Sequence, residues 1–293
     1  MFEEEFVDVG DGITLATRSL DSVGPARLTF LLVHGLASNA QLWDGVAEQL
    51  AVAGYRSVAV DARGHGRSPD ATSGYDTETA AADLARVLRV LDSGLDTPRP
   101  VVAAGQSWGG NVVLTLAARH PGSVDGIALL DGGWIRLGHR FATFDECWQV
   151  LAPPVIPAGV TFDGIRAGLR AGHPDWPEDG IAATLANLRV DDSGRVVNRL
   201  AREHHRSILE SLYRADPRQL YPEVTVPSLL MPAGGPASPI ASAVDEAVGG
   251  LPDARVLRYD DADHDLHAQF PRRVAADLSG FAADLVTRAT GVA

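Results

Sequence analysis

One stretch early in the chain restricts the possible folds more than any other. An apolar run, Val101–Ala104, leads into Gly105-Gln106-Ser107-Trp108-Gly109, and an apolar helical pattern follows at once. Strand, G-x-S-x-G and helix in this order are typical of a nucleophile elbow, a turn so sharp that the serine backbone is strained. The flanking positions must be small, because strand and helix would otherwise collide. The stretch therefore predicts that Ser107 projects from a sheet edge, with the Trp108 backbone N–H free to face a developing negative charge.

The rest of the chain alternates between strand and helix patterns. Gly10-Asp11-Gly12 predicts a hairpin turn between the first two strands. This alternation implies an α/β fold with a mostly parallel, doubly wound sheet. Strands are expected at 4–9, 12–20, 27–33, 56–60, from 101 to the elbow, 124–130, 226–231 and 255–259, and helices at 43–53, 76–92, from the elbow to about 120, 240–249 and 271–289.

The alternation is interrupted between the sixth and seventh of the core strands. From Trp134 to about Pro222 the sequence has scattered aromatics, short helical patterns and a hairpin signal at Asp191–Gly194. We therefore expect one core built from residues 1–133 and 223–293, with residues 134–222 inserted. Ligands of open α/β sheets bind at the carboxyl edge, so an apolar insertion at this edge predicts a helical lid over a pocket.

Composition excludes some partners. The formal net charge is −13, and all 25 basic residues are Arg. This balance argues against nucleic acid or an anionic membrane as a partner. The single cysteine, Cys147, excludes an internal disulfide framework and is expected to be buried. An acidic N-terminus without an apolar secretion segment favours a cytoplasmic location, and the oligomeric state is not indicated.

A serine hydroxyl needs a base, usually a histidine that a third group orients. Asp263-His264 follows the last strand and supplies the candidate base, His264; the less favoured alternative is His267. The motifs together resemble the α/β-hydrolase superfamily, in particular its lid-bearing serine esterase and lactonase-like branch. The motifs are His34-Gly35, Asp61-x-Arg63-Gly64-x-Gly66-x-Ser68, Gly105-x-Ser107-x-Gly109, and His264 followed by Pro271.

The resemblance implies an oxyanion hole made of two backbone N–H groups, those of Leu36 and Trp108. Each such donor stabilises a transition state by roughly 3 kcal/mol. In the same loops, His34 and His65 are expected to bond backbone. Asp61 and Arg63 are expected to fix loop architecture.

The acid of the triad departs from the commoner pattern of the family. Most relatives carry it in the loop after the seventh strand, but residues 233–239 contain no carboxylate. Asp131 ends the sixth strand, where some superfamily members, including haloalkane dehalogenases, place their acid. We therefore expect Asp131 to orient His264; the alternative is an Asp that only caps a turn. Asp245 and Glu246 lie inside the next helix, and the acids at 260, 261, 263 and 265 are too near His264 in sequence.

Weaker candidates for a substrate pocket are Trp134, Trp148, Trp176, His204 and His205. For the three tryptophans, the alternative is packing in the core of the lid. Adjacent histidines on a helix diverge, so a metal site at 204–205 is not expected, and neither is a cofactor. The sequence thus predicts a serine hydrolase for an ester, thioester or lactone with a sizeable apolar part. Alternatives are C–C bond hydrolysis, perhydrolysis, or acyl transfer or cyclisation on the same triad. A ligand-binding receptor is the alternative from another class.

Overall fold

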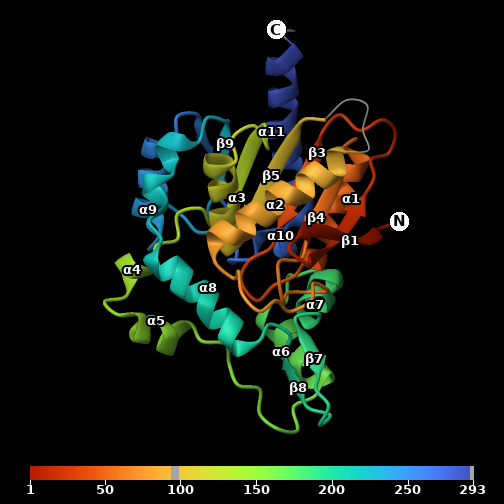
Figure 1. Ribbon diagram of the computed structural model, residues 1–293, viewed down its shortest axis with the longest axis vertical. Helices are drawn as coiled ribbons and strands as arrows, with labels where there is room; N and C mark the ends of the chain where they lie inside the picture. The colour runs from red at the N-terminus through yellow and green to blue at the C-terminus, as the bar shows by residue number, and fades with distance from the viewer. Residues whose placement is uncertain (94–98, 291–293) are drawn as a thin grey trace.

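A mostly parallel, eight-stranded sheet forms the centre of the protein (Figure 1). The computed structural model describes residues 1–93 and 99–290. The strands, in spatial order, are β1 (Glu3–Gly10), β2 (Ile13–Leu20), β4 (Arg56–Val60), β3 (Thr29–Val33), β5 (Val101–Gln106), β6 (Gly126–Leu130), β9 (Ser228–Met231) and β10 (Ala254–Val256). Within this sheet, as far as the described residues show, only the β1–β2 and β2–β4 pairs are antiparallel. The predicted fold class is confirmed.

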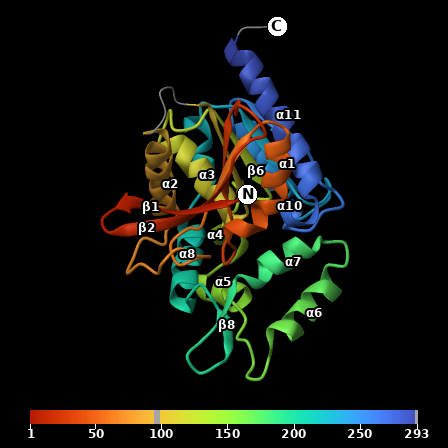
Figure 2. The same cartoon turned by 90° about the vertical axis from the view of Figure 1, so that its right-hand side faces the viewer.

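Helices cover both faces of the sheet, as Figure 2 shows. One face carries α2 (Thr77–Asp92), α3 (Trp108–Arg119) and α9 (Ala241–Gly250), and the other α1 (Asp44–Val52), the short α10 (Leu266–Gln269) and α11 (Pro271–Thr290). Successive strand residues point to opposite cores: Leu31 and Val33 pack with the α2 and α3 side, and Phe30 and Leu32 with the α1 and α11 side. This explains why the parallel strands read as continuous apolar runs. None of the described helices is both long and apolar enough to cross a bilayer.

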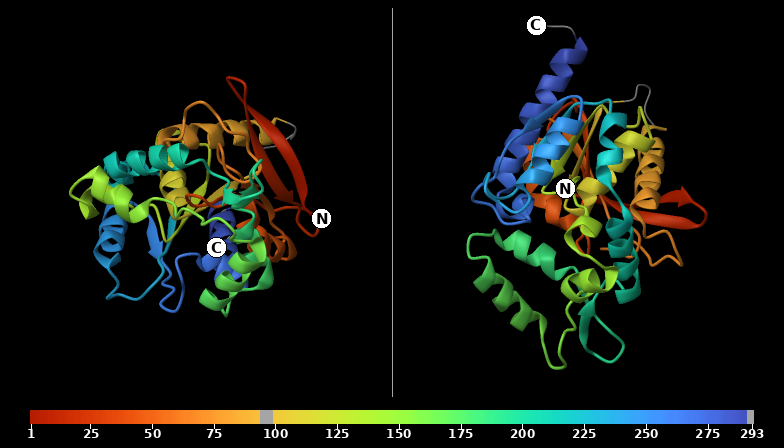
Figure 3. Two further views of the ribbon diagram at one scale, coloured as in Figure 1. Left: turned by 90° about the horizontal axis from the view of Figure 1, so that it is seen from below. Right: turned by 90° about the vertical axis from the view of Figure 1, so that its left-hand side faces the viewer.

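Residues 134–222, called the insertion below, lie beyond the carboxyl ends of the parallel strands (Figures 1 and 3). Its elements are α4 (Leu137–Arg140), α5 (Phe144–Leu151), α6 (Phe162–Gly172), α7 (Glu178–Leu185), β7 (Leu188–Val190), β8 (Val196–Asn198), α8 (Arg202–Arg214) and the 3-10 helices η2 (Pro217–Gln219) and η3 (Tyr221–Glu223). A third short 3-10 helix, η1 (Ala40–Trp43), precedes α1 in the core. The predicted hairpin is present as the antiparallel pair β7–β8.

Helix α8 is the part of the insertion that is tied to the core beside the elbow. The Thr77 backbone N–H donates to the Ser211 hydroxyl at 3.0 Å. The Trp108 indole N–H donates to the Thr77 hydroxyl at 3.1 Å. A chain of polar contacts therefore runs from the residue after Ser107 to α8.

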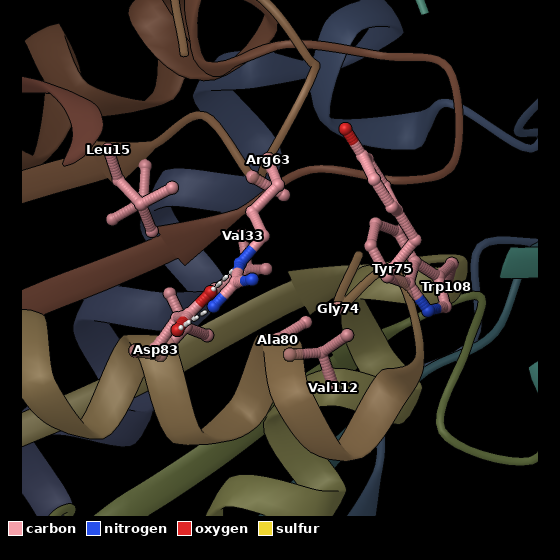
Figure 4. Close-up of a pocket in the computed structure, with 12 residues that line it drawn as sticks. Leu15, Val33, Arg63, Gly74, Tyr75, Ala80, Asp83, Trp108 and Val112 are labelled. Atoms are coloured by element: carbon pink, nitrogen blue, oxygen red, sulfur yellow. Dashed lines mark hydrogen bonds and ion pairs between the residues drawn. The ribbon is translucent and has the colours of Figure 1, made fainter. Parts of the chain in front are cut away.

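A buried ion pair ties the loop after β4 to α2. Figure 4 shows the Arg63 guanidinium facing the Asp83 carboxylate beside a small apolar cavity. The pair is bidentate, with Nε–Oδ2 and Nη2–Oδ1 distances of 2.7 and 2.9 Å. The Asp83 side chain is 2% exposed. Arg63 thus fixes loop architecture, as the sequence predicts.

Asp83→Ala should lower the free energy of unfolding by about 3 kcal/mol, because it leaves a buried guanidinium without its partner. Asp21→Ala is the matched control, since Asp21 pairs with Arg56 but is 78% exposed. Its loss should stay below about 1 kcal/mol. Urea unfolding of both variants measures the difference, and equal losses would contradict the structural role given to Asp83.

Candidate active site

Ser107 occupies a turn in which backbone packs directly on backbone. Its φ and ψ are 55° and −123°, so its conformation lies in a region that non-glycine residues rarely adopt. A Cβ at Gly105 would lie 2.1 Å from the Gly109 carbonyl oxygen. A Cβ at Gly109 would lie 2.5 Å from the carbonyl oxygens of Val33 and His34. The small residues at these positions are therefore required by space, as the sequence predicts.

Three side chains from three loops converge at this turn. The Ser107 hydroxyl lies 2.8 Å from Nε2 of His264. Nδ1 of the same ring lies 2.6 Å from Oδ2 of Asp131. With a neutral ring, Nδ1–H donates to the carboxylate and Nε2 accepts the serine proton. The predicted contact between Asp131 and His264 is confirmed as geometry.

Asp131 is held in place by the neighbouring loop. It follows β6 directly with a φ of 45°, and its Oδ1 accepts the Ala233 backbone N–H at 3.1 Å. The other acids considered have different partners. Asp245 pairs with Arg258, and Oδ2 of Asp263 accepts from the Trp176 indole at 3.2 Å. Of the described residues, only Asp131 hydrogen-bonds His264 through a carboxylate.

The pKa of His264 lies above its ordinary value of 6.5. Burial lowers this pKa, but the hydrogen bond to Asp131 and the charges of Asp265 and Asp131 raise it by more. The pKa of the neighbouring Asp265 carboxyl is also raised, mainly by burial. The Asp131 carboxylate therefore stabilises the imidazolium that forms when the His264 ring takes a proton.

Two backbone N–H groups near Ser107 have no hydrogen-bond acceptor among the described residues. Trp108 is the first residue of α3, so its N–H has no partner within the helix. The Leu36 N–H also bonds no acceptor among the described residues. Both residues line the cavity that contains the Ser107 hydroxyl. Unpaired backbone N–H donors beside a nucleophile are the kind of group that an oxyanion hole uses.

His34 and His65 brace the loops around the Leu36 N–H. Nε2 of His34 accepts the Ala62 N–H at 3.0 Å, and Nε2 of His65 accepts the Ala37 N–H at 3.2 Å. In each ring Nδ1 faces a carbonyl oxygen, so each ring is a neutral Nδ1–H tautomer. Burial lowers the pKa of both rings, which agrees with the neutral form. Asp61 adds to this brace, accepting the Ala40 N–H at 2.7 Å.

The loop that carries His264 is held by two glutamines that the sequence analysis did not single out. The Gln106 side chain donates to the His264 carbonyl at 3.0 Å. Oε1 of Gln269 accepts the Asp263 N–H at 2.6 Å, and its Nε2 donates to Asp175. Gln106 is the variable position before the serine in G-x-S-x-G. The only hint in the sequence to the role of Gln106 is its position next to Ser107. The contacts of Gln269 depend on the tertiary fold.

A cavity of about 900 Å³ opens above Ser107 and His264. Its walls come from Leu36 in the loop after β3, from α4 and α8 of the insertion, and from the segment 238–243. Trp134 and His205 line it, as expected, and Leu209, Leu212 and Ile240 add apolar wall. Arg136, His139 and Arg140 also line it, although the sequence analysis did not name them. An elongated, partly apolar molecule fits this space.

Three pocket candidates from the sequence lie elsewhere. Trp148 packs on α8, with the Arg202 guanidinium 4.8 Å from its ring centroid. His204 stacks on Tyr75 at 3.9 Å and faces Asp70. Trp176 belongs to a separate apolar cluster with Leu42 and Ile181, and its indole bonds Asp263. These three residues therefore pack within the insertion or against the core and do not line the cavity.

Two other candidates are packing residues. His267 is fully buried against Trp43, and burial lowers its pKa to about 3, so it faces neither Ser107 nor solvent. Cys147 is also fully buried, as predicted. Within residues 1–93 and 99–290, no cluster of His, Cys, Asp and Glu has the arrangement needed to hold a metal ion.

Comparisons with known proteins agree with this architecture. A family model described as "alpha/beta hydrolase fold" matches residues 29–154. The 2-(acetamidomethylene)succinate hydrolase of Mesorhizobium japonicum is 27% identical over 281 residues, 94% of this chain and 93% of that protein. A non-heme haloperoxidase of Rhodococcus erythropolis is 28% identical over 287 residues, 94% of this chain and 98% of that protein.

A solved structure gives the same picture of the fold. The crystal structure of an E-2-(acetamidomethylene)succinate hydrolase superposes with a TM-score of 0.76 at 24% identity. The superposition covers 97% of this chain and all of the other. The likeness therefore extends over the sheet, its helices and the insertion.

Gly105→Ala should destabilise the protein by about 3 kcal/mol, because the new Cβ meets backbone that cannot move away independently. Gly280→Ala is the control, since Gly280 lies in α11 with no atom within 4 Å of an added Cβ. It should stabilise the helix by about 1 kcal/mol. Urea unfolding midpoints test both signs. An unaffected Gly105→Ala variant would mean that the turn is not crowded as described.

Proposed function

The chain belongs to the α/β-hydrolase superfamily of enzymes, and from that premise we propose that it is a serine hydrolase. Its substrate would be an ester, thioester or lactone with a sizeable apolar part, cleaved through an acyl-enzyme on Ser107. The observation that carries the proposal is the hydrogen-bonded array Ser107–His264–Asp131, which stands in the wall of a cavity of about 900 Å³.

In the first half-reaction, Ser107 attacks the carbonyl carbon while Nε2 of His264 accepts the hydroxyl proton. The carbonyl oxygen becomes negatively charged and takes hydrogen bonds from the Leu36 and Trp108 N–H groups. Collapse of the tetrahedral intermediate expels the alcohol or thiol, which receives the proton from His264. The acyl group remains on Ser107.

In the second half-reaction, His264 removes a proton from water, and the hydroxide attacks the acyl carbon. The same two N–H groups stabilise the second oxyanion. The intermediate releases the carboxylic acid and returns the proton to Ser107. Throughout, Asp131 keeps Nδ1 protonated and stabilises the positive ring, and it does not itself take the proton.

The insertion acts in this proposal as a lid. Residues of α4 and α8 form the cavity wall opposite the sheet edge, so the insertion would exclude water and select acyl chains. Apolar side chains such as Trp134 and Leu209 contribute to that wall. The expected preference is for esters with an apolar acyl part.

Perhydrolysis is the second candidate, favoured by the likeness to a non-heme haloperoxidase. In it, hydrogen peroxide takes the place of water in the second half-reaction and the product is a peracid. The first half-reaction and all residue roles stay the same. Peracid formation from an ester and hydrogen peroxide, measured beside ester hydrolysis, decides between the two products.

Ser107→Ala should keep the fold and reduce hydrolysis of p-nitrophenyl butyrate by about 10⁴ or more, because the nucleophile is gone. A fluorophosphonate probe should label the wild type at Ser107 and leave the variant unlabelled. Ser279→Ala, on α11 far from the cavity, is the control and should behave as the wild type. Labelling at another residue, or unchanged turnover in Ser107→Ala, would overturn the mechanism. Ligand binding without turnover would instead point to a receptor.

Asp131→Asn should reduce kcat by about 10² or more, because the amide favours the wrong imidazole tautomer. It should also move the pH profile. The base must be unprotonated, so kcat/KM of the wild type rises with pH through the His264 pKa, which lies above 6.5. Without the carboxylate this pKa falls, so the acid limb of the residual activity shifts to lower pH. An acid limb that stays in place would show that Asp131 does not act on His264.

A further inference from the structure

A second chamber lies next to the catalytic cavity. It measures about 200 Å³. Leu151 and His205 line both spaces, so these two side chains stand between them. Ala37 and Ser38, which follow the oxyanion residue Leu36, line the chamber as well. The chamber therefore adjoins the catalytic cavity at Leu151 and His205.

The wall between the two spaces is held by a single hydrogen bond between its members. Nε2 of His205 lies 3.2 Å from the Leu151 carbonyl oxygen, so Nε2–H is the donor. Burial lowers the pKa of His205, which keeps the ring neutral and leaves Nδ1 as an acceptor. The residue is 7% exposed. The flat His205 ring on α8 thus forms a constriction between the two spaces. Among the described residues, no salt bridge or covalent link holds this ring in place.

The chamber has polar side chains among its apolar lining, as the catalytic cavity does. Asn187, Asn198 and Arg199 line it. The buried Ser38 hydroxyl and Nδ1 of His205 have no hydrogen-bond partner among the described residues. Buried polar groups without partners are rare and unfavourable, since each has lost its hydration. A bound group that offers hydrogen bonds would remove this penalty.

Arg199 gives the chamber its charge. Its Nε donates to the Ala186 carbonyl at 3.2 Å, and no carboxylate of the described residues pairs with it. Most other arginines near the insertion have an acidic partner, for example Arg170 with Glu178 and Arg195 with Asp191. Among residues lining the chamber, none is acidic. An unpaired guanidinium in a concave, polar space is suited to a carboxylate.

We propose that this chamber is a subsite for the distal carboxylate of an elongated acyl substrate. Arg199 would bind the carboxylate, and His205 with Leu151 would form the constriction through which the chain passes. The proposal rests on the serine hydrolase function and names its substrate class: esters or thioesters of a medium-length acid with a second, free carboxylate. The reacting carbonyl stays at Ser107, and the apolar chain lies in the catalytic cavity.

Binding tests the subsite without turnover. In the Ser107→Ala background, we would measure Kd for monomethyl suberate, which has a distal carboxylate, and for neutral dimethyl suberate. The monoanion should bind about tenfold more tightly, the size expected of a hydrogen bond to a charged group. Adding Arg199→Gln should remove this preference, and adding Arg199→Lys should retain part of it.

The matched control is Arg189→Gln, which removes the same charge from the exposed β7–β8 hairpin and lines neither space. It should leave the preference for the monoanion unchanged. An equal loss in the Arg189 and Arg199 variants would overturn the subsite and indicate a general charge effect. Equal affinity of the two esters for the parent protein would overturn it too.

Turnover tests the constriction. His205→Ala joins the two spaces, so the ratio of kcat/KM for p-nitrophenyl laurate over butyrate should rise about tenfold, as apolar chains gain room. His204→Ala, which alters the adjacent residue outside both spaces, should leave the ratio unchanged. Leu151→Ala should act in the same direction as His205→Ala and guards against a folding defect in one variant.

These experiments test the serine hydrolase function separately from the subsite and its constriction. Absence of both ester turnover and fluorophosphonate labelling overturns the serine hydrolase function, while the Kd values still decide on the subsite. Normal turnover with an unchanged chain-length ratio in both His205→Ala and Leu151→Ala overturns the constriction and leaves the hydrolase function standing.

Discussion

At Ser107, backbone atoms of three chain segments meet with no room for a side chain between them. The crowding involves the turn itself, the end of β3 and the loop after β6. A Cβ at Gly132, for example, would lie 2.0 Å from the Ser107 carbonyl oxygen. Contacts of this kind hold Ser107 at a positive φ, which is unfavourable on its own and persists only because the surroundings fix it. The same contacts set the positions of the Leu36 and Trp108 N–H groups, so one cause places the proposed nucleophile and the proposed oxyanion donors together.

The position of the acid follows from the order of the strands. β6 and β9 are parallel neighbours, so their carboxyl ends open at the same place. Asp131 follows β6, and it accepts a hydrogen bond from Ala233 in the loop after β9. A carboxylate on either loop could thus reach Nδ1 of His264. Residues 233–239 contain no acid, but Asp131 in the neighbouring loop after β6 supplies the carboxylate that His264 bonds.

Much of this arrangement could be predicted from the sequence, and the reasons differ between parts. The parallel strands are buried on both faces, so their apolar runs identified the sheet. The candidate site could be predicted from the glycines around Ser107 and from the order Ser107, Asp131, His264. Both backbone crowding and the positions of loops after strands can be recognised in the local sequence. The Asp191–Gly194 turn could be predicted equally well, since a few residues are enough to specify a turn.

The insertion shows where such reasoning ends. Its helices are amphipathic, so the sequence reveals a buried face but not which partner covers it. Trp176 illustrates the point: the sequence leaves open whether it is lid core or cavity wall, and the structure shows it packed on Leu42 and bonded to Asp263. Gln269, Asp175 and Asp263 meet only because loops distant in sequence adjoin in space. Contacts of this kind have no period or motif, so only the tertiary structure shows them.

The charge distribution links the surface to the cavities. The chain carries a formal charge of −13, yet Asp131 is the only carboxylate among the described residues that line the catalytic cavity or the chamber behind His205. Arg136, Arg140 and Arg199 line the same spaces. Surface charges are screened over about 10 Å at 0.1 M salt, whereas charges inside a cavity with low-dielectric walls act at short range with little screening. Arginines therefore outnumber carboxylates in the lining of these spaces, although Arg136 pairs with Glu246 at 2.9 Å. In the proposed function, an anionic acyl group would meet Arg140 and Arg199 only after it has entered, so its recognition inside the cavity would be separate from attraction at the surface.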